Sequence, residues 1–116
     1  MTYSEEAYRR IWFVAVVPTC RWERGVVGAM RGVPVDVHCA VESDPPARSY
    51  RWKFNNSGET LDVPADRFQS TSNGTSSTLR YTAHSDHDYG TLTCAAENSV
   101  GVQQEPCVFT VISASE

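Results

Sequence analysis

Cysteine is the residue type whose number and placement most restrict the chemistry open to this 116-residue chain. It occurs at four positions: Cys20, Cys39, Cys94 and Cys107. An even number of cysteines in a small chain is typical of disulfide bonds, which form and persist in oxidising compartments. A zinc site or free thiols are the alternatives for Cys20 and Cys107, but no histidine lies at ligand spacing from either cysteine. We therefore expect two disulfides and an extracellular protein.

The other residues able to do chemistry form one short run of histidines and aspartates: His84, Asp86, His87 and Asp88. His84 and His87 would need a third ligand to make a convincing metal site. No motif places a general base beside a serine or cysteine nucleophile, and no glycine-rich phosphate loop occurs. The run predicts a polar loop, and we expect no catalysis, no metal, no cofactor and no small-molecule substrate.

The charge balance narrows the choice of partners. The net charge is -4, and the ten basic residues are scattered along the chain. Nucleic acids and anionic membranes favour a clustered basic face. Neither is therefore an expected partner.

The segments that carry Cys39 and Cys94 alternate apolar and polar residues, which is the pattern of a half-buried strand. Trp52 lies between them in an aromatic segment. This cysteine, tryptophan, cysteine pattern is typical of the immunoglobulin sandwich, in which a disulfide spans two sheets about 10 Å apart and the indole packs against it. We predict an all-β, antiparallel Greek-key β-sandwich of the I-set or C2 type, with Trp52, Leu79 and Leu92 in its core.

The sandwich also restricts the disulfide pairing. Four cysteines can pair in three ways, but only one way fits this fold. Cys39 and Cys94 would form the bond between the sheets, and Cys20 and Cys107 would join the first and last strands, which can run side by side. Each bond would close a long loop, for which the chain-entropy model gives roughly 4 kcal/mol.

Turn residues divide the chain into short segments and indicate one domain. The expected strands cover residues 25–30, 33–41, 49–54, 59–63, 67–71, 77–82, 91–97 and 102–112. Residues 1–17 are expected to be a leader, a tag or the tail of a preceding domain, residues 18–113 the immunoglobulin-like domain, and residues 114–116 the start of a linker. Residues 11–17 are apolar, but acidic residues precede them and no small-residue cleavage site follows, which argues against a secretory signal.

Four segments together resemble one particular family. They are FNNSGET at residues 54–60, STLRYT at 77–82, DYGTLTCAAENSVG at 88–101 and QEPCVF at 104–109. With the additional Cys20 and Cys107, they are similar to an immunoglobulin domain of the Sidestep family, which are insect cell-surface proteins of the immunoglobulin superfamily. The resemblance covers about residues 18–112.

This resemblance implies a place and a role for the domain. Sidestep-family proteins have a string of immunoglobulin domains, a fibronectin type III domain, one membrane span and a cytoplasmic tail. They are ligands of the Beaten path immunoglobulin receptors in axon guidance, and their amino-terminal domain carries receptor binding. The chain looks most like the last immunoglobulin domain, so it is expected to act mainly as a stalk or spacer in a membrane glycoprotein.

A direct adhesion module is the alternative function. It would use the outer face of the sheet formed by the C, F and G strands for homophilic or heterophilic contact. The residues expected there are mostly polar: Arg51, Lys53, Thr93, Ala95 and Glu97. This set lacks the aromatic anchors of a strong interface, and its composition favours the spacer.

Leu92 departs from the general immunoglobulin pattern, which places a tyrosine there whose hydroxyl binds the backbone of the corner before the strand. Leucine keeps the buried area and loses that hydrogen bond. We expect an ion pair between Arg67 and Asp88 to hold the corner instead. The alternative is that Asp88 only caps the turn.

Two sequons lie on predicted loops, Asn55-Asn56-Ser57 and Asn73-Gly74-Thr75. In a secreted protein such sequons are acceptors for N-linked glycans. We therefore expect glycosylation at Asn55 and Asn73.

Overall fold

The computed structural model describes residues 16–114 except 23, 57–58, 64–67 and 71–73. The described elements are strands, with one short 3-10 helix at Asp86–Asp88. The strands are β1 (Val16–Cys20), β2 (Arg24–Ala29), β3 (Val35–Asp44), β4 (Ser49–Asn56), β5 (Glu59–Asp62), β6 (Phe68–Ser70), β7 (Ser76–Tyr81), β8 (Gly90–Glu97) and β9 (Cys107–Ser113). No helix in this part of the chain is long and apolar enough to cross a membrane.

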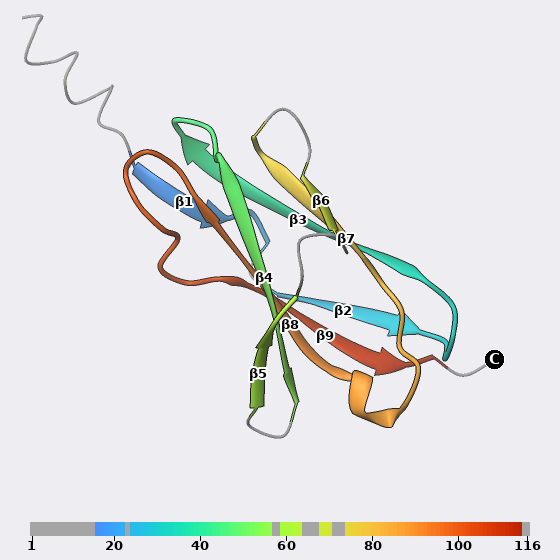
Figure 1. Cartoon of the computed structure of the whole chain (residues 1–116). Coiled ribbons are helices and arrows are strands. Elements are labelled where there is room, and N and C mark those ends of the chain that lie inside the picture. Colours follow the sequence, from blue (N-terminus) through green and yellow to red (C-terminus); the bar gives the residue numbers. More distant parts are fainter. Residues whose placement is uncertain (1–15, 23, 57–58, 64–67, 71–73, 115–116) are drawn as a thin grey trace, which may run out of the picture.

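Two sheets face each other, which confirms the predicted all-β sandwich (Figure 1). One sheet has the strand order β1-β3-β7-β6, and the other has the order β2-β9-β8-β4-β5. The pairs are antiparallel except for β2 and β9, which run parallel. This one parallel pair at the sheet edge is a feature that the sequence-based prediction of an antiparallel sandwich did not include. The parallel pair arises because the chain changes sheets. β1 pairs with β3 in one sheet, and the chain then crosses to the other sheet, where β2 pairs with β9.

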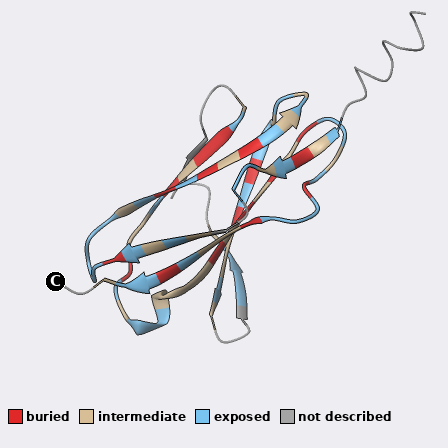
Figure 2. Ribbon diagram, turned by 180° about the vertical axis from the view of Figure 1, so that it is seen from behind, coloured by how far each residue is buried: buried red, intermediate tan, exposed pale blue. Residues whose placement is uncertain are grey.

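The core lies between the two sheets, where buried residues alternate with more exposed ones along β3 and β8 (Figure 2). Trp52, Leu79 and Leu92 are fully buried there. The Trp52 indole donates a hydrogen bond to Ser77 Oγ at 3.0 Å, across the gap between the sheets. Its ring also lies 5.9 Å from that of Phe109. The large indole therefore fills the centre of the sandwich without leaving its own polar atom unpaired.

Some strand boundaries differ from those expected, and β3 and β9 both begin later than the apolar pattern indicates. A turn precedes β3 and keeps residue 33 out of the strand. In this turn the Val33 amide donates to the Met30 carbonyl, and Gly32 has a φ of 81°. A positive φ favours glycine because it has no Cβ. Before β9, residues between Glu97 and Cys107 form a loop instead of the expected strand start at residue 102.

Candidate functional site

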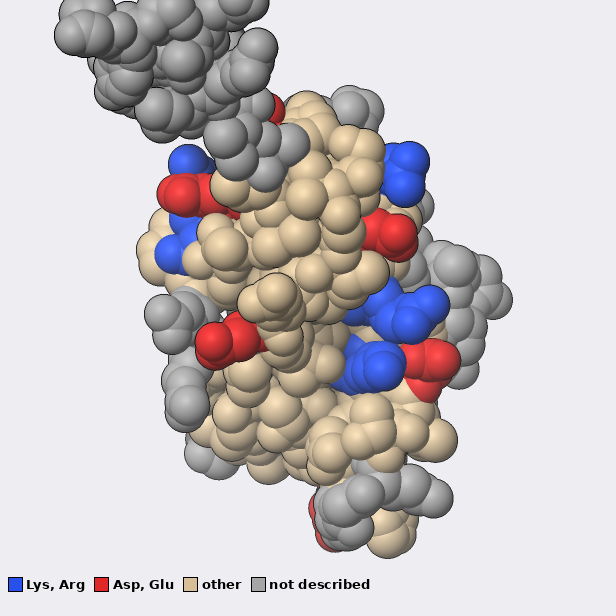
Figure 3. All heavy atoms as spheres, turned by 90° about the vertical axis from the view of Figure 1, so that its left-hand side faces the viewer, with Lys and Arg blue, Asp and Glu red and all other residues tan. Residues whose placement is uncertain are grey.

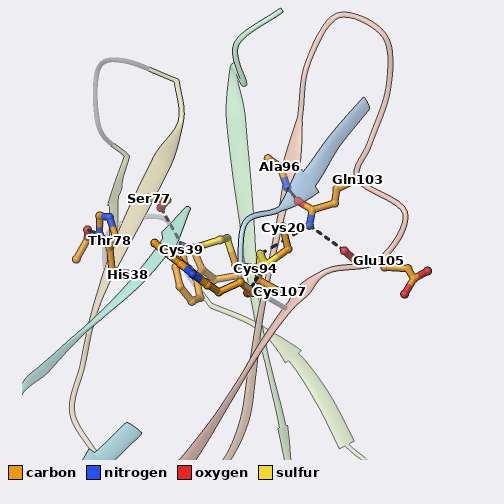
Figure 4. Close-up of a disulfide and its surroundings, with 12 residues drawn as sticks. Cys20, His38, Cys39, Ser77, Thr78, Cys94, Ala96, Gln103, Glu105 and Cys107 are labelled. Carbon is orange, nitrogen blue, oxygen red and sulfur yellow. Dashed lines mark hydrogen bonds between the residues drawn. A yellow bond between two sulfur atoms is a disulfide. The ribbon is translucent and has the colours of Figure 1, made fainter. Parts of the chain in front are cut away.

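Two disulfides lie side by side across the sandwich, and their pairing confirms the prediction (Figure 4). Cys39 on β3 is bonded to Cys94 on β8, and Cys20 at the end of β1 is bonded to Cys107 at the start of β9. Cys94 and Cys107 are register partners on neighbouring strands. Cys20 faces Val41, two residues along β3 from Cys39. Both bonds therefore join the same two sheets within one small region of the core.

The corner before β8 is held by Tyr81 and by the carboxylate of Asp88. The Tyr81 hydroxyl donates to the Asp88 carbonyl at 2.7 Å, and so supplies from β7 the kind of bond that Leu92 cannot make. The Asp88 carboxylate accepts the backbone amides of His84 at 2.8 Å and Ser85 at 3.1 Å, so it caps the turn. Arg67 lies outside the described residues, and its ion pair with Asp88 stays a prediction.

Two further side chains tie this corner to the rest of the sandwich. The Asn56 amide, at the end of β4, donates to the carbonyls of His87 at 2.8 Å and Tyr89 at 2.9 Å. The Tyr89 hydroxyl donates to the Ala29 carbonyl at 2.9 Å. Sequence reasoning did not identify these contacts, because they join residues that are far apart in the chain.

The histidine and aspartate run lies at this corner. His84, Asp86 and His87 are exposed. Asp86 forms an ion pair with Arg31. Within the described residues, no group of three or more potential ligands could hold a metal ion. The contacts of the run are those of a capped surface loop.

Asn98 organises the end of the sandwich at which β1 begins. Its side chain is 1% exposed. Its amide nitrogen donates to the Val16 carbonyl at 2.7 Å, the Ser43 hydroxyl at 3.2 Å and the Pro45 carbonyl at 3.1 Å. Its amide oxygen accepts the backbone amides that follow, from Val100 at 2.9 Å and from residue 101 at 3.1 Å. One buried side-chain amide thus joins three separate segments of the chain. We call the region formed by Val16, Ser43, Pro45 and residues 98–101 the β1 end of the domain.

Gln103 performs a similar function in the loop before β9. Gln103 is buried, and its side-chain oxygen accepts a hydrogen bond from the Ala96 backbone amide at 3.0 Å. Its backbone amide donates to the Ala96 carbonyl at 2.8 Å. Its side-chain nitrogen donates to the Glu105 carbonyl at 2.8 Å (Figure 4). The loop is therefore fixed against β8 although it lies outside the regular ladder.

A groove of about 370 Å³ lies on the outer face of the five-stranded sheet, beside this loop. The register pairs Arg51 with Ala95 and Lys53 with Thr93, which places both cations on the face opposite to buried Trp52. The groove is lined by Ser49, Tyr50, Arg51, Lys53, Thr93, Ala95, Glu97, Val102 and Pro106. These include all five residues that the sequence placed on the adhesive face.

Figure 3 shows the side of the molecule on which this sheet lies, with basic side chains gathered near its middle and acidic side chains around them. Within the described residues, Arg51 and Lys53 make no ion pair. Asp62 faces Lys53 in the strand register without a salt bridge to it. Glu97 is already engaged, since it accepts from Ser49 at 3.5 Å and lies 4.0 Å from the Arg48 guanidinium.

Tyr50 is the one described residue with a buried side-chain polar atom that has no hydrogen-bond partner among the described residues. Burial raises the pKa of Tyr50 to about 12, because the charged phenolate would be poorly solvated. The neutral phenol is therefore the form present at physiological pH.

Of the two sequons, Asn55 is exposed near the end of β4, and its side-chain amide donates to Thr60 Oγ1 at 2.8 Å. Asn73 lies outside the described residues. Glycosylation of either asparagine stays a prediction.

Comparison with known proteins gives one family match and many structural neighbours. The sequence model of a family described as Immunoglobulin domain matches residues 18–98. No curated protein sequence matches. Titin Ig tandem domains A164–A165 superpose with a TM-score of 0.62 and 22% identity over 87% of this chain and 49% of that chain. A structure of Dscam superposes with a TM-score of 0.60 and 18% identity, over 85% of this chain and 25% of that chain.

A structure of the titin M10 and obscurin-like 1 Ig complex has a TM-score of 0.55 and 25% identity, over 86% of this chain and 98% of that chain. The chain spans about half the length of the titin tandem and a quarter of the Dscam fragment. At these low identities, the titin tandem and Dscam likenesses show the fold alone.

Proposed function

Because this chain belongs to the immunoglobulin domain family, we propose that it is a non-catalytic extracellular module of a multidomain cell-surface recognition protein resembling Sidestep. Its main role is that of a stalk or spacer. The family is a non-enzymatic kind of domain, and disulfides of this kind belong to oxidising compartments. The titin tandem shows that similar domains occur one after another in a chain.

The observation that carries the spacer role is the construction of the β1 end. Asn98 fixes three segments there through its buried side chain. A Cβ at residue 101 would lie only 3.3 Å from Val17 Cγ1, so the glycine leaves room for β1 there. Around this fixed frame, Val16 is 50% exposed and Val100 is 47% exposed. A neighbouring domain attached before residue 16 could cover these valines and so be held at a set angle.

The resemblance supplies the partners that this proposal includes. They are neighbouring immunoglobulin and fibronectin type III domains in the same chain, and an immunoglobulin receptor of the Beaten path type that binds elsewhere in the chain. The protein would then be an axon-guidance ligand anchored by a single membrane span.

A domain exchange in the full-length chain tests the spacer role. This domain is replaced by an unrelated immunoglobulin domain of equal length, and receptor ectodomain binding to expressing cells is measured. Receptor affinity is expected to be unchanged, whereas deletion of the amino-terminal domain should abolish binding. Loss of receptor binding in the exchanged protein, at equal surface expression, would show that this domain is itself the recognition site.

A further inference from the structure

The groove on the outer face of the five-stranded sheet has the features of a binding site that a spacer does not need. We propose that it binds an extended acidic segment of a partner protein, with a carboxylate between Arg51 and Lys53 and an apolar side chain against Val102 and Pro106. This inference is independent of the spacer role.

Charge is the first reason. The chain has a net charge of -4, yet two cations lie two residues apart on the outer face of β4 without an acidic partner among the described residues. Glu97, which also lines the groove, lies 3.5 Å from Ser49 Oγ and 4.0 Å from the Arg48 guanidinium. Asp62 faces Lys53 in the strand register without a salt bridge to it, and Arg51 faces Ala95. A carboxylate from outside the molecule would therefore meet two cations that form no salt bridge within the described residues, and electrostatic complementarity of this kind gives specificity and speeds association.

Shape is the second reason. Thr93 and Ala95, both half-buried, form a floor of small side chains between the cations and the loop before β9. Val102 is 56% exposed and stands at the wall of the groove together with Pro106. The loop that carries both residues is fixed by Gln103, so the wall is in place before a ligand binds. Preformed sites lose less conformational freedom on binding.

The predicted glycan is compatible with this site. Asn55 shares the outer face of β4 with Arg51 and Lys53, but it faces Thr91 and Thr60 and is not among the lining residues. A glycan there would border the groove at the end away from Val102.

Nuclear magnetic resonance titration of the isotopically labelled 116-residue chain tests the proposal. The probe is an N-acetylated, C-amidated peptide of sequence EDLED, and its neutral counterpart QNLQN is the control ligand. The acidic peptide is expected to shift the amide signals of Arg51, Lys53, Thr93 and Ala95. Raising the salt concentration from 50 to 300 mM should weaken binding about fivefold, because the screening length falls below about 10 Å.

Variants separate this groove from general surface charge. Arg51→Glu combined with Lys53→Glu should weaken binding by about tenfold or more, since like charges then face the peptide. Arg80→Glu, on the outer face of the other sheet, removes an exposed basic side chain and should leave binding unchanged. Val102→Ser should weaken binding by about threefold through lost apolar contact.

Several outcomes would overturn the proposal. These are no shifts at 5 mM peptide, equal binding of QNLQN, or an equal loss in the Arg80→Glu protein. Signals at the groove that move on dilution of the free protein would identify a second copy of this chain as the occupant instead. Tighter binding of a heparin oligosaccharide than of EDLED at the same residues would assign the groove to a sulfated glycan.

Discussion

The Cys20–Cys107 bond should stabilise the domain, but by less than its long loop suggests, because the Cys39–Cys94 bond lies inside that loop. Alone, a crosslink over 87 residues would contribute about 4.6 kcal/mol in the chain-entropy model. The Cys39–Cys94 bond already joins positions 55 residues apart within that loop. With Cys39–Cys94 in place, the Cys20–Cys107 bond closes an effective loop of only about 32 residues in the unfolded chain, which is 87 minus 55. A loop of this length corresponds to about 3.7 kcal/mol of stabilisation.

The perturbation is the double substitution Cys20→Ala with Cys107→Ala. Cys107 is fully buried, so loss of its sulfur adds up to about 1 kcal/mol of packing. The free energy of unfolding at neutral pH should therefore fall by about 4 kcal/mol, measured by urea denaturation followed by tryptophan fluorescence. The matched variant Cys39→Ala with Cys94→Ala should lose more, because both of its cysteines are fully buried and Cys94 faces Trp52.

A loss below about 1 kcal/mol in the Cys20 and Cys107 variant would refute this reasoning. It would mean that the unfolded chain is already restricted near these residues, or that the loop estimate does not apply to a nested bond. A loss larger than that of the inner pair would contradict the assignment of Cys39–Cys94 as the central bond of the core.

Three further substitutions test individual contacts. Asn98→Ala should reduce the free energy of unfolding by about 2–3 kcal/mol, since buried carbonyls and amides lose their partner; a urea curve within 0.5 kcal/mol of the parent would argue against the buried network. Tyr81→Phe should cost about 1 kcal/mol by the same assay, and no change would mean that other contacts suffice at the corner. Tyr50→Phe should be neutral at pH 7, because the hydroxyl has no partner among the described residues. The parent should then lose roughly 2 kcal/mol between pH 10 and pH 12, where the unfolded tyrosine ionises and the folded one, with its pKa near 12, does not; an equal loss in Tyr50→Phe would exclude Tyr50 as the cause.

The sequence predicted the features that depend on residue type and local spacing. The cysteine, tryptophan, cysteine pattern and the period-two alternation were enough to identify the two-sheet sandwich and to pair Cys39 with Cys94. The outer pairing followed because only Cys20 and Cys107 then remained. The outward face of β4 and β8 was also predictable, because Arg51 and Lys53 must face away from a buried Trp52.

Features that depend on long-range contacts were not predictable from the sequence. The parallel pairing of β2 with β9 requires the chain to change sheets after Cys20, and no local signal marks that crossing. The expected strand over residues 91–97 ends just before Asn98, and Gln103 was expected to lie in the strand over 102–112. In the structure, both side chains are buried and supply partners for backbone groups. A polar residue of this kind can sit on a surface loop or at a buried hub, and its sequence neighbours do not distinguish the two.

The compartment in which the domain folds is the point on which the proposed function depends most. We would isolate the protein from cells that express it naturally, block free thiols under denaturing conditions, and map the disulfide-linked peptides by mass spectrometry. An extracellular module should show Cys39 joined to Cys94, Cys20 joined to Cys107 and no free thiol. Four free thiols in the native material would contradict an extracellular location.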